Sequence, residues 1–572
     1  MVELLHLDGR PDPNANAVEE RNSPVIAEGD RLLKKCINLK KEQQEIISTM
    51  KSILSHRGYS INKAAVGVMK ISELKKELTL IPFSEREEFA HLVKPIELFQ
   101  ETDVRFYMPR YAGIKMFGEP ENDKITKKEF QHRPNLKFKG KPRPAQLPVI
   151  EAANRGMDTV GGGIISIGCA GGKTVIAIYL ACQRKRQIPT AVVCHTTGMM
   201  MQWVERIREF CPTAKIGIVQ QNKCELEDKD FIIMSVKTIA LKQYPAHHFD
   251  RIGLVIWDEI HLMCTNLFSK AFAKLATKHG LGLSATPFRK DKCDTVFSHH
   301  IGPVLYSKKR DADRSVEAHC ISLQLDGIES VYNKFGKIMY TSMAVAITKR
   351  DDRTEYLANL IGGLGSQGRC VLVLSEYINH LKSIKKAIEE CYFYRSCPQQ
   401  QYAFMSAWHS QSDSPLKVLP KDIGKIIASH IVRPVTCGLY IGEMKNKDRK
   451  ISEGKDILLG SYKMASVGMD IPTLNSLVFA SPRKDIEQSV GRILRAKHAA
   501  FNPIIYDIID NHGVFKAQSK ARKDFYRQYE YTIVHTQQLA NGTVLSSRKV
   551  KAKKSKEDDE DNETPGDCMF LE

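Results

Sequence analysis

The sequence lacks three features that would assign it to well-known classes. Its 14 cysteines are scattered without a CxxC pair, and the nearest two, Cys391 and Cys397, have a spacing that fits no common metal site. This argues against a disulfide framework or a zinc module and favours a reducing, intracellular compartment. No stretch approaches the ~20 apolar residues that cross a bilayer. The opening MVELLHLDGRPDPN has no basic segment followed by an apolar run, so we expect neither a secretory signal nor a membrane partner.

The composition is that of a large globular protein with excess positive charge. At ~150 residues per domain, a chain this long predicts three or four units. The 572 residues include 85 Lys and Arg against 66 Asp and Glu, a net charge of +19. Such a balance favours a polyanionic partner, most simply nucleic acid. The alternative is a solubility surplus spread over a large surface.

The beginning and the end of the chain differ from the middle in their pattern of apolar and charged residues. Residues 1–125 predict a small α+β domain, with a helix over Arg31–Leu54 and strands at Glu77–Phe83 and Val104–Pro109. Residues 541–572 combine opposite charge blocks with few apolar residues and predict a disordered tail.

The middle of the chain alternates short apolar runs with helical stretches, which predicts parallel sheets covered on both faces. The alternation runs through residues 126–310 and again through 311–540, with a pause between Ile301 and Ser330. We therefore expect two consecutive α/β domains. Inside the second, residues 394–436 have no sheet-like pattern and are interpreted as an insertion.

Two segments carry the chemistry of a phosphate site. IGCAGGKT (Ile167–Thr174) lies between an apolar strand and a helix, where backbone N–H groups can turn toward an anion. Lys173 would reach the β- and γ-phosphates and Thr174 would offer a hydroxyl to Mg²⁺, although Ile167 occupies the first Gly position of the strict GxxxxGK[ST] pattern. LVIWDEIH places Asp258 at a strand end to hold Mg²⁺ and Glu259 to polarise the attacking water. Alone, each segment could be an ordinary turn; together they predict ATP hydrolysis.

The order of the later motifs resembles superfamily-two helicases, nucleic-acid motors of two tandem RecA-like domains with doubly wound parallel sheets. SATP (Ser284–Pro287), VGMDIP (Val467–Pro472) and QSVGRILR (Gln488–Arg495) follow the phosphate loop. RPAQ (Arg143–Gln146) and CHTTGMMMQW (Cys194–Trp203) are similar to the branch of xeroderma-pigmentosum-B-type, phage branch-migration and poxvirus transcript-release helicases, and large-DNA-virus helicases look most alike. Ala170 departs from the usual Gly.

The resemblance implies roles for individual residues. Arg492 and Arg495, one helical turn apart, would be arginine fingers brought to the γ-phosphate from the second α/β domain. His261, Ser284, Thr286 and Gln488 would couple the ATP site to strand movement. The nucleotide would contact Gln146, Ile167, Gly168, Cys169, Ala170, Gly171, Gly172, Lys173, Thr174, Gly468 and Asp470. The nucleic-acid strand would contact Thr196, Gln202, Trp203, Ser235, Thr238, Ser375, Ser461 and Tyr462, mostly through phosphate.

The implied function is an ATP- and Mg²⁺-dependent helicase or translocase, acting on nucleic acid, with DNA as the first expectation and RNA as the alternative, in transcription, repair or recombination. Partner proteins would bind the N-terminal domain or the tail. A viral origin would place the enzyme in the virion or at a nuclear or cytoplasmic site of replication or transcription. One alternative is a double-strand translocase that does not separate strands. It is disfavoured because QSVGRILR lacks the trailing residues of the longer RxxRxGQ-type motif that Swi2/Snf2-type remodellers tend to have. The other alternative is a non-hydrolysing scaffold, which is disfavoured because Lys173, Glu259 and the Arg pair are all present. No nuclease pattern suggests a restriction-type motor.

Overall fold

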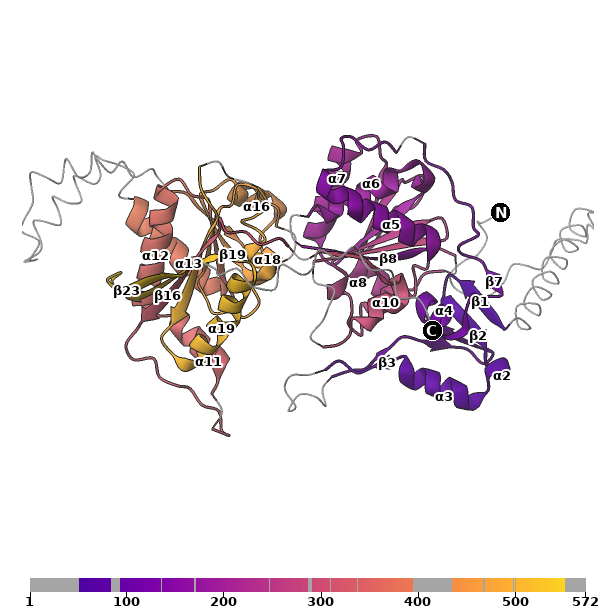
Figure 1. Cartoon of the computed structure of the whole chain (residues 1–572), viewed down its shortest axis with the longest axis horizontal. Coiled ribbons are helices and arrows are strands. Elements are labelled where there is room, and N and C mark those ends of the chain that lie inside the picture. The colour runs from indigo at the N-terminus through magenta and orange to yellow at the C-terminus, as the bar shows by residue number, and fades with distance from the viewer. Residues whose placement is uncertain are drawn as a thin grey trace, which may run out of the picture.

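The computed structural model describes residues 51–83, 93–134, 136–168, 171–245, 247–285, 291–308, 310–336, 338–393, 435–466, 469–496, 498 and 500–550. They form an N-terminal α+β unit followed by two α/β units that lie side by side (Figure 1). In these residues no helix is long and apolar enough to cross a membrane.

The N-terminal unit is built on a five-stranded sheet with the order β5-β6-β2-β1-β7. Its elements are β1 (Ser52–Ser55), β2 (Gly58–Asn62), α2 (Lys63–Val66), α3 (Val68–Glu77), β3 (Thr79–Leu80), β4 (Ile96–Glu97), β5 (Gln100–Glu101), β6 (Arg105–Met108), α4 (Arg110–Phe117) and β7 (Asn122–Asp123). The predicted helix over Arg31–Leu54 is wrong at its end, because Ile53 and Leu54 are buried in β1, which pairs with β2; residues 31–50 lie outside the described residues.

The first α/β unit contains an eight-stranded sheet with the order β11-β10-β12-β9-β13-β14-β8-β15, parallel except for the β10–β11 pair. Helices α5, α6 and α7 pack on one face and α8, α9 and α10 on the other. Its elements are η2 (Pro144–Gln146), α5 (Leu147–Thr159), β8 (Gly162–Ile167), α6 (Lys173–Cys182), η3 (Arg184–Arg186), β9 (Thr190–Cys194), α7 (Thr197–Phe210), β10 (Ile216–Gln220), β11 (Lys223–Cys224), β12 (Phe231–Ser235), α8 (Val236–Leu241), β13 (Leu254–Asp258), η4 (Ile260–Leu262), α9 (Ser269–Phe272), β14 (His279–Ser284), α10 (Thr295–Ile301) and β15 (Val304–Lys308).

The second α/β unit repeats this architecture with the order β18-β19-β17-β20-β21-β16-β22-β23, parallel except for the β22–β23 pair. Its elements are β16 (Glu317–Gln324), α11 (Tyr340–Thr348), α12 (Asp351–Ser366), β17 (Val371–Ser375), α13 (Ile378–Phe393), β18 (Cys437–Tyr440), α16 (Asn446–Glu453), β19 (Ile457–Ser461), α17 (Tyr462–Ser466), β20 (Ser476–Phe479), α18 (Glu487–Val490), β21 (Ile504–Asp510), α19 (Gly513–Gln528), β22 (Thr532–Leu539) and β23 (Val544–Val550). The two sheets confirm the predicted tandem RecA-like fold.

Two boundaries differ from the sequence prediction. The predicted pause in the strand–helix alternation between Ile301 and Ser330 is wrong. Two strands lie in this interval, β15 at the edge of the first sheet and β16 inside the second. The disordered tail predicted from residue 541 is wrong for its first ten residues, because exposed β23 pairs with β22 through backbone hydrogen bonds, which an apolar pattern does not report. Residues 551–572, and the predicted insertion except residues 435–436, lie outside the described residues.

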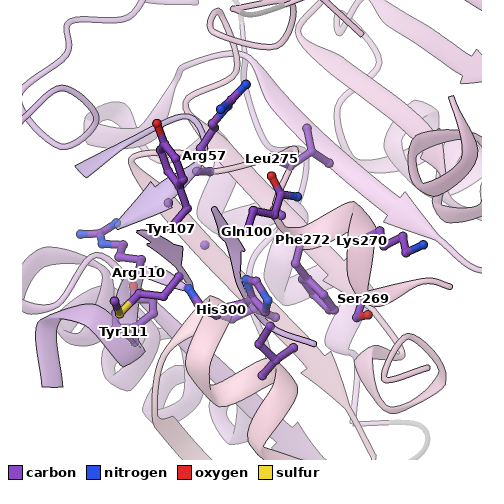
Figure 2. A pocket seen from close by; sticks show the side chains of 18 of the residues that line it. Arg57, Gln100, Tyr107, Arg110, Tyr111, Ser269, Lys270, Phe272, Leu275 and His300 are labelled. Carbon is purple, nitrogen blue, oxygen red and sulfur yellow. The ribbon is translucent and has the colours of Figure 1, made fainter. Parts of the chain in front are cut away.

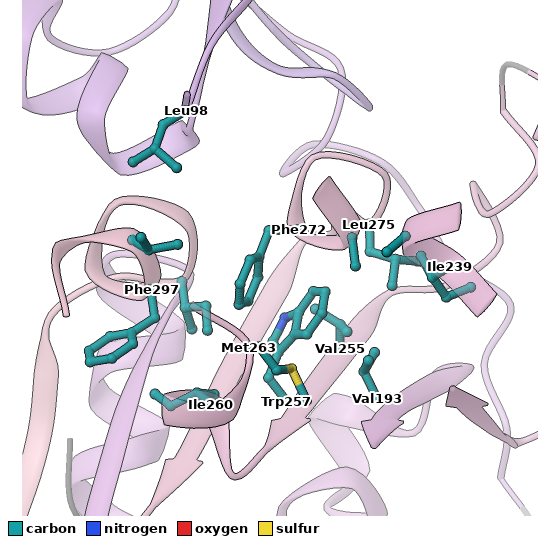
Figure 3. Packing of buried hydrophobic residues seen from close by; sticks show 14 of the residues in the cluster. Leu98, Val193, Ile239, Val255, Trp257, Ile260, Met263, Phe272, Leu275 and Phe297 are labelled. Carbon is teal, nitrogen blue, oxygen red and sulfur yellow. The ribbon is translucent and has the colours of Figure 1, made fainter. Parts of the chain in front are cut away.

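The N-terminal unit shares a hydrophobic core with the first α/β unit. Leu98 of the N-terminal unit belongs to the same buried cluster as Trp257 and Phe272, as Figure 3 shows. A cavity at this junction, lined by Tyr107, Phe272 and other residues labelled in Figure 2, measures about 80 Å³. It is too small for a nucleotide, so the candidate site lies elsewhere.

Candidate functional site

The candidate site is a cleft of about 350 Å³ where the two α/β units meet. The first unit contributes the turn between β8 and α6 and the end of β13; the second contributes residues after α17 and α18. The carboxyl ends of parallel strands meet at one sheet edge, which brings these turns together and makes that edge the usual ligand site of open α/β sheets. The lining residues are Arg143, Gly168, Gly172, Lys173, Thr174, Val175, Met199, Gln202, Trp203, Arg206, Phe210, Asp258, Glu259, Asp470, Pro472, Arg492 and Arg495.

The turn between β8 and α6 has the shape of a phosphate-binding loop. Gly172 precedes the helix with φ of 84°, in the left-handed region, and a Cβ there would lie 2.3 Å from Gln146 Nε2. Gly171 donates its N–H to the Gly168 carbonyl at 3.2 Å. The left-handed backbone favours glycine at position 172, and a side chain there would also have to displace the Gln146 amide. Cys169 and Ala170 lie outside the described residues.

Lys173, the first residue of α6, points its ammonium group into the cleft. Its Nζ donates to the Ile167 carbonyl at 3.2 Å and lies 3.9 Å from Glu259 Oε1. These contacts hold the ammonium group at the N-terminus of α6, where the helix dipole also favours an anion. The position suits a phosphate that would replace the weak ion pair.

Two neighbouring carboxylates end β13. Asp258 accepts a 2.7 Å hydrogen bond from Trp203 Nε1. Burial, and next the Glu259 charge, raise the pKa of Asp258 to about 7. Glu259 adopts φ of 50°, and its Oε2 is buried without a hydrogen bond among the described residues. Buried Asp258 and half-buried Glu259 bring two carboxylates together, which is costly unless a cation compensates it. The donor set therefore fits Mg²⁺, which prefers oxygen ligands.

His261 links this site to the second α/β unit. Its Nδ1 lies 3.0 Å from Ser284 Oγ and 3.4 Å from Glu259 Oε2, while its Nε2 lies 3.4 Å from Gln488 Nε2. The structure thus brings three of the four predicted coupling residues into one polar chain. Thr286 lies outside the described residues.

Arg492 and Arg495 both line the cleft opposite Lys173, but each has partners within its own unit. Arg492 is buried and donates through Nε to the Ala465 carbonyl at 2.6 Å and through Nη1 to the Met469 carbonyl. Arg495 forms an ion pair with Asp470. Their place at the cleft is compatible with the predicted finger role. The geometry adds a second role, because these contacts also fix the loop that carries Asp470.

Asp470 bridges the two α/β units. Its second oxygen lies 2.6 Å from Arg206 Nη2 of α7. Burial alone would raise the pKa of Asp470, but the two guanidinium groups outweigh it and hold the pKa below its usual value. The sequence analysis missed Arg206, although it follows Gln202 by four residues and therefore shares a helix face with it. Gly468 lies outside the described residues.

The predicted nucleic-acid contacts fall into two groups. Thr196, Ser235 and Ser461 follow or end strands at the carboxyl edges of the two sheets, where each accepts a backbone hydrogen bond at the start of a helix. Thr196 and Ser235 cap α7 and α8. The strand contacts predicted for these three residues stay a prediction.

The side chains of the other group are buried or line the ATP cleft. Trp203 and Tyr462 are buried, with hydrogen bonds to Asp258 and the Ser481 carbonyl, and their predicted strand contacts stay a prediction. Thr238 and Ser375 are also buried; Thr238 accepts from the Gln221 N–H and Ser375 pairs with His380. Gln202 lines the ATP cleft. Sequence similarity cannot separate a residue that touches a ligand from one that supports the loop beside it.

The comparisons with known proteins agree with this geometry. Residues 139–289 match the family described as "Type III restriction enzyme, res subunit". The chain is 30% identical over 489 residues to "Putative ATP-dependent RNA helicase L396" of Acanthamoeba polyphaga mimivirus, covering 85% of this chain and 87% of that protein. It is 23% identical to "Putative helicase 161L" of Invertebrate iridescent virus 6, covering 69% and 83%. It is 22% identical to "DNA repair helicase/translocase XPB-R" of Trypanosoma brucei brucei, covering 69% and 55%.

Proposed function

Because this chain belongs to the superfamily-two helicases, we propose that it is an ATP-driven motor that moves along DNA and separates its strands. The observation that carries the proposal is the cleft that unites Lys173, Asp258 and Glu259 of one α/β unit with Arg492 and Arg495 of the other. A site divided between two units changes when they move relative to each other, which is what a motor requires.

Each residue has a role that follows from its chemistry. Lys173 and the backbone N–H groups of the loop would hold the β- and γ-phosphates of ATP. Mg²⁺, held by Thr174 and Asp258, would neutralise charge on the phosphates. Glu259, whose Oε2 accepts no hydrogen bond among the described residues, would orient the attacking water and take its proton.

Closure of the two units would complete this site. Asp470 pairs with both Arg206 and Arg495 and so holds the second unit against α7. The His261–Gln488 contact lies in the same interface between the two α/β units. A nucleotide drawn into the cleft would bring its phosphates to the guanidinium groups, so that hydrolysis weakens closure and lets the units separate. Repeated closing and opening would move the strand across the carboxyl edges of both sheets.

The +19 charge supports a nucleic-acid substrate of either kind. The choice of DNA rests on the likeness to a protein named as a DNA repair helicase/translocase, against another named as an RNA helicase. We place the enzyme in transcription, repair or recombination, at the nuclear or cytoplasmic sites where a large DNA virus would carry them out, with protein partners on the N-terminal unit.

The test is ATP turnover with single-stranded DNA, closed duplex, forked duplex and single-stranded RNA. We expect DNA with a single-stranded arm to stimulate turnover at least tenfold, and Glu259→Gln to bind ATP but hydrolyse it at least 100-fold more slowly, because general-base catalysis contributes roughly 10²–10⁴-fold. Stronger stimulation by RNA would reassign the substrate. Stimulation by closed duplex without strand separation would favour a double-strand translocase, and no stimulation at all would contradict the motor.

A further inference from the structure

We infer that the hairpin between β16 and α11, described over residues 331–336 and 338–339, is a pin that stacks on an unpaired base where the motor meets a duplex. The inference rests on the proposed function and adds to it a site for the bases themselves. In Figure 1 this segment extends below the second α/β unit, beyond α11.

The hairpin presents rings and apolar side chains to solvent instead of burying them. Tyr332 pairs with Ile338 in an antiparallel bridge, and the Met339 N–H donates to the Val331 carbonyl at 2.7 Å. Phe335 is 74% exposed and Tyr332 58%, and Val331, Ile338 and Met339 are exposed as well. Exposing several large apolar groups on one projection is unfavourable for an unliganded surface, which marks it as a binding element.

The tip of the hairpin is fixed by its turn. Asn333 accepts the Phe335 N–H on its side chain at 2.9 Å and the Gly336 N–H on its carbonyl at 3.0 Å. Gly336 has φ of 71°, a left-handed conformation suited to glycine. The Phe335 ring is therefore held at the tip by a defined turn.

The base of the hairpin is anchored to the body of the unit. The Ser330 hydroxyl lies 2.9 Å from His512 Nε2. On the other side, the Tyr340 hydroxyl donates to Gln518 Oε1 at 3.0 Å, and the Tyr340 ring contacts Phe515 edge-on at 5.7 Å between centroids. Both ends thus attach at α19, so force on the tip is carried to the α/β unit that moves during the ATP cycle.

The base of the hairpin lies beside the loop after Ser375, which is predicted to contact the nucleic-acid strand. Tyr377, two residues beyond Ser375, packs on the same buried cluster as Tyr340 and Phe515. Since β16 runs parallel to β21, and β21 to β20 and β17, the hairpin and the Ser375 loop leave the same carboxyl edge of the sheet. A nucleic-acid strand that crosses that edge would meet the pin.

The charge of the segment favours nucleic acid over an apolar protein partner. Between Ser330 and Arg350 the chain has no acidic residue. Lys334 lies with its Nζ 5.1 Å from the centroid of the Phe335 ring, and Lys516 and Lys520 are exposed on α19. An aromatic face beside ammonium groups is the combination that binds a base and its phosphate without reading sequence.

The experiment compares strand separation with ATP turnover in the full chain. Phe335→Ala should lower the unwinding rate of a forked DNA duplex roughly tenfold or more, the effect of losing one base stack. Turnover stimulated by single-stranded DNA should fall by no more than about threefold, since the ATP cleft is unaltered. Phe335→Trp should retain unwinding because it keeps a ring, whereas Phe335→Leu should fail like Ala.

Met69→Ala is the matched control, because Met69 is an equally exposed apolar side chain on α3 of the N-terminal unit; it should match the wild type in both assays. Unwinding by Phe335→Ala at the wild-type rate, or equal rescue by Leu and Trp, would overturn the pin while leaving the proposed motor intact. A wild-type protein whose ATPase no nucleic acid stimulates would overturn the proposed function, and the pin with it.

Discussion

Lys173 is the residue on which the ATP site most depends. It is the one lysine among the described lining residues of the cleft, and it lies within 3.9 Å of Glu259. We expect Lys173→Ala to lose ATP turnover by at least 100-fold while the protein stays folded, because the loop loses its side-chain cation without losing a core contact. The check is turnover beside circular dichroism; a folded variant with wild-type turnover would contradict the site.

Substitution of Arg492 can distinguish a role at the γ-phosphate from a structural role in holding the Asp470 loop, which the sequence could not do. A finger role predicts that Arg492→Ala binds ATP with nearly unchanged affinity but loses about 10³-fold or more in turnover. Lys should rescue it poorly, because an ammonium group lacks the planar fork that serves the Ala465 and Met469 carbonyls. Nucleotide titration and turnover on the same variant decide the matter: equal loss of both would leave Arg492 a purely structural residue.

For single residues, the sequence predicted chemical role better than burial and hydrogen-bond partners. Lys173, Asp258 and Glu259 follow from residue type and position after a strand, and the structure places them in one cleft. The burial of Trp203 and Tyr462 could not be predicted, because it depends on parts of the chain that are distant in sequence and pack against them. Arg206 was missed because its partner, Asp470, is 264 positions away.

At the scale of elements, strands buried along their whole length could be predicted and partly exposed strands could not. β9, β13, β17 and β20 are largely apolar and buried along their whole length, so their composition predicts them. β15 is largely exposed at a sheet edge, and β16 alternates buried with half-buried residues. Their hydrogen-bond partners define them as strands, and those partners are distant in sequence.

The contact between α12, α13 and β17 makes the second α/β unit sensitive to acid. His380 is buried, with Nδ1 on Ser375 Oγ and Nε2 3.5 Å from Arg353, which pairs with Asp510. Burial, and next the Arg353 charge, lower the pKa of His380 to about 3. Below its unfolded pKa near 6.5, the unfolded chain gains a proton that the folded state refuses, so stability falls by up to about 1.4 kcal/mol per pH unit.

We therefore expect the Tm to drop on going from pH 7.5 to 5.5, and His380→Gln to reduce that drop by about 2–4 °C, the effect of about 1 kcal/mol in a unit of this size. The amide can still bond Ser375 but cannot titrate. Thermal unfolding of both proteins at the two pH values measures the difference. An identical drop in both would show that His380 is not the group responsible.

At the scale of the whole molecule, the net charge of +19 sets the response to salt. If the protein holds duplex DNA through phosphates, log Kd should change linearly with log salt, with a slope near 0.9 per phosphate neutralised. Sequence preference should be weak. Binding titrations from about 50 to 200 mM salt on two unrelated sequences test both points; a flat response would assign the charge to solubility instead.

The order of strands in the second sheet governs when that sheet can form. β16 lies between β21 and β22, whose residues come about 190 and 220 positions later in the chain, whereas every strand of the first sheet is complete by Lys308. During synthesis the first unit can fold while the second is still being made. β16 must wait with both its edges unpaired until Asp510 has left the ribosome, and with one edge unpaired until Leu539 has followed. A pause or truncation in that interval would expose two open edges, so this unit is where aggregation of a nascent chain would start.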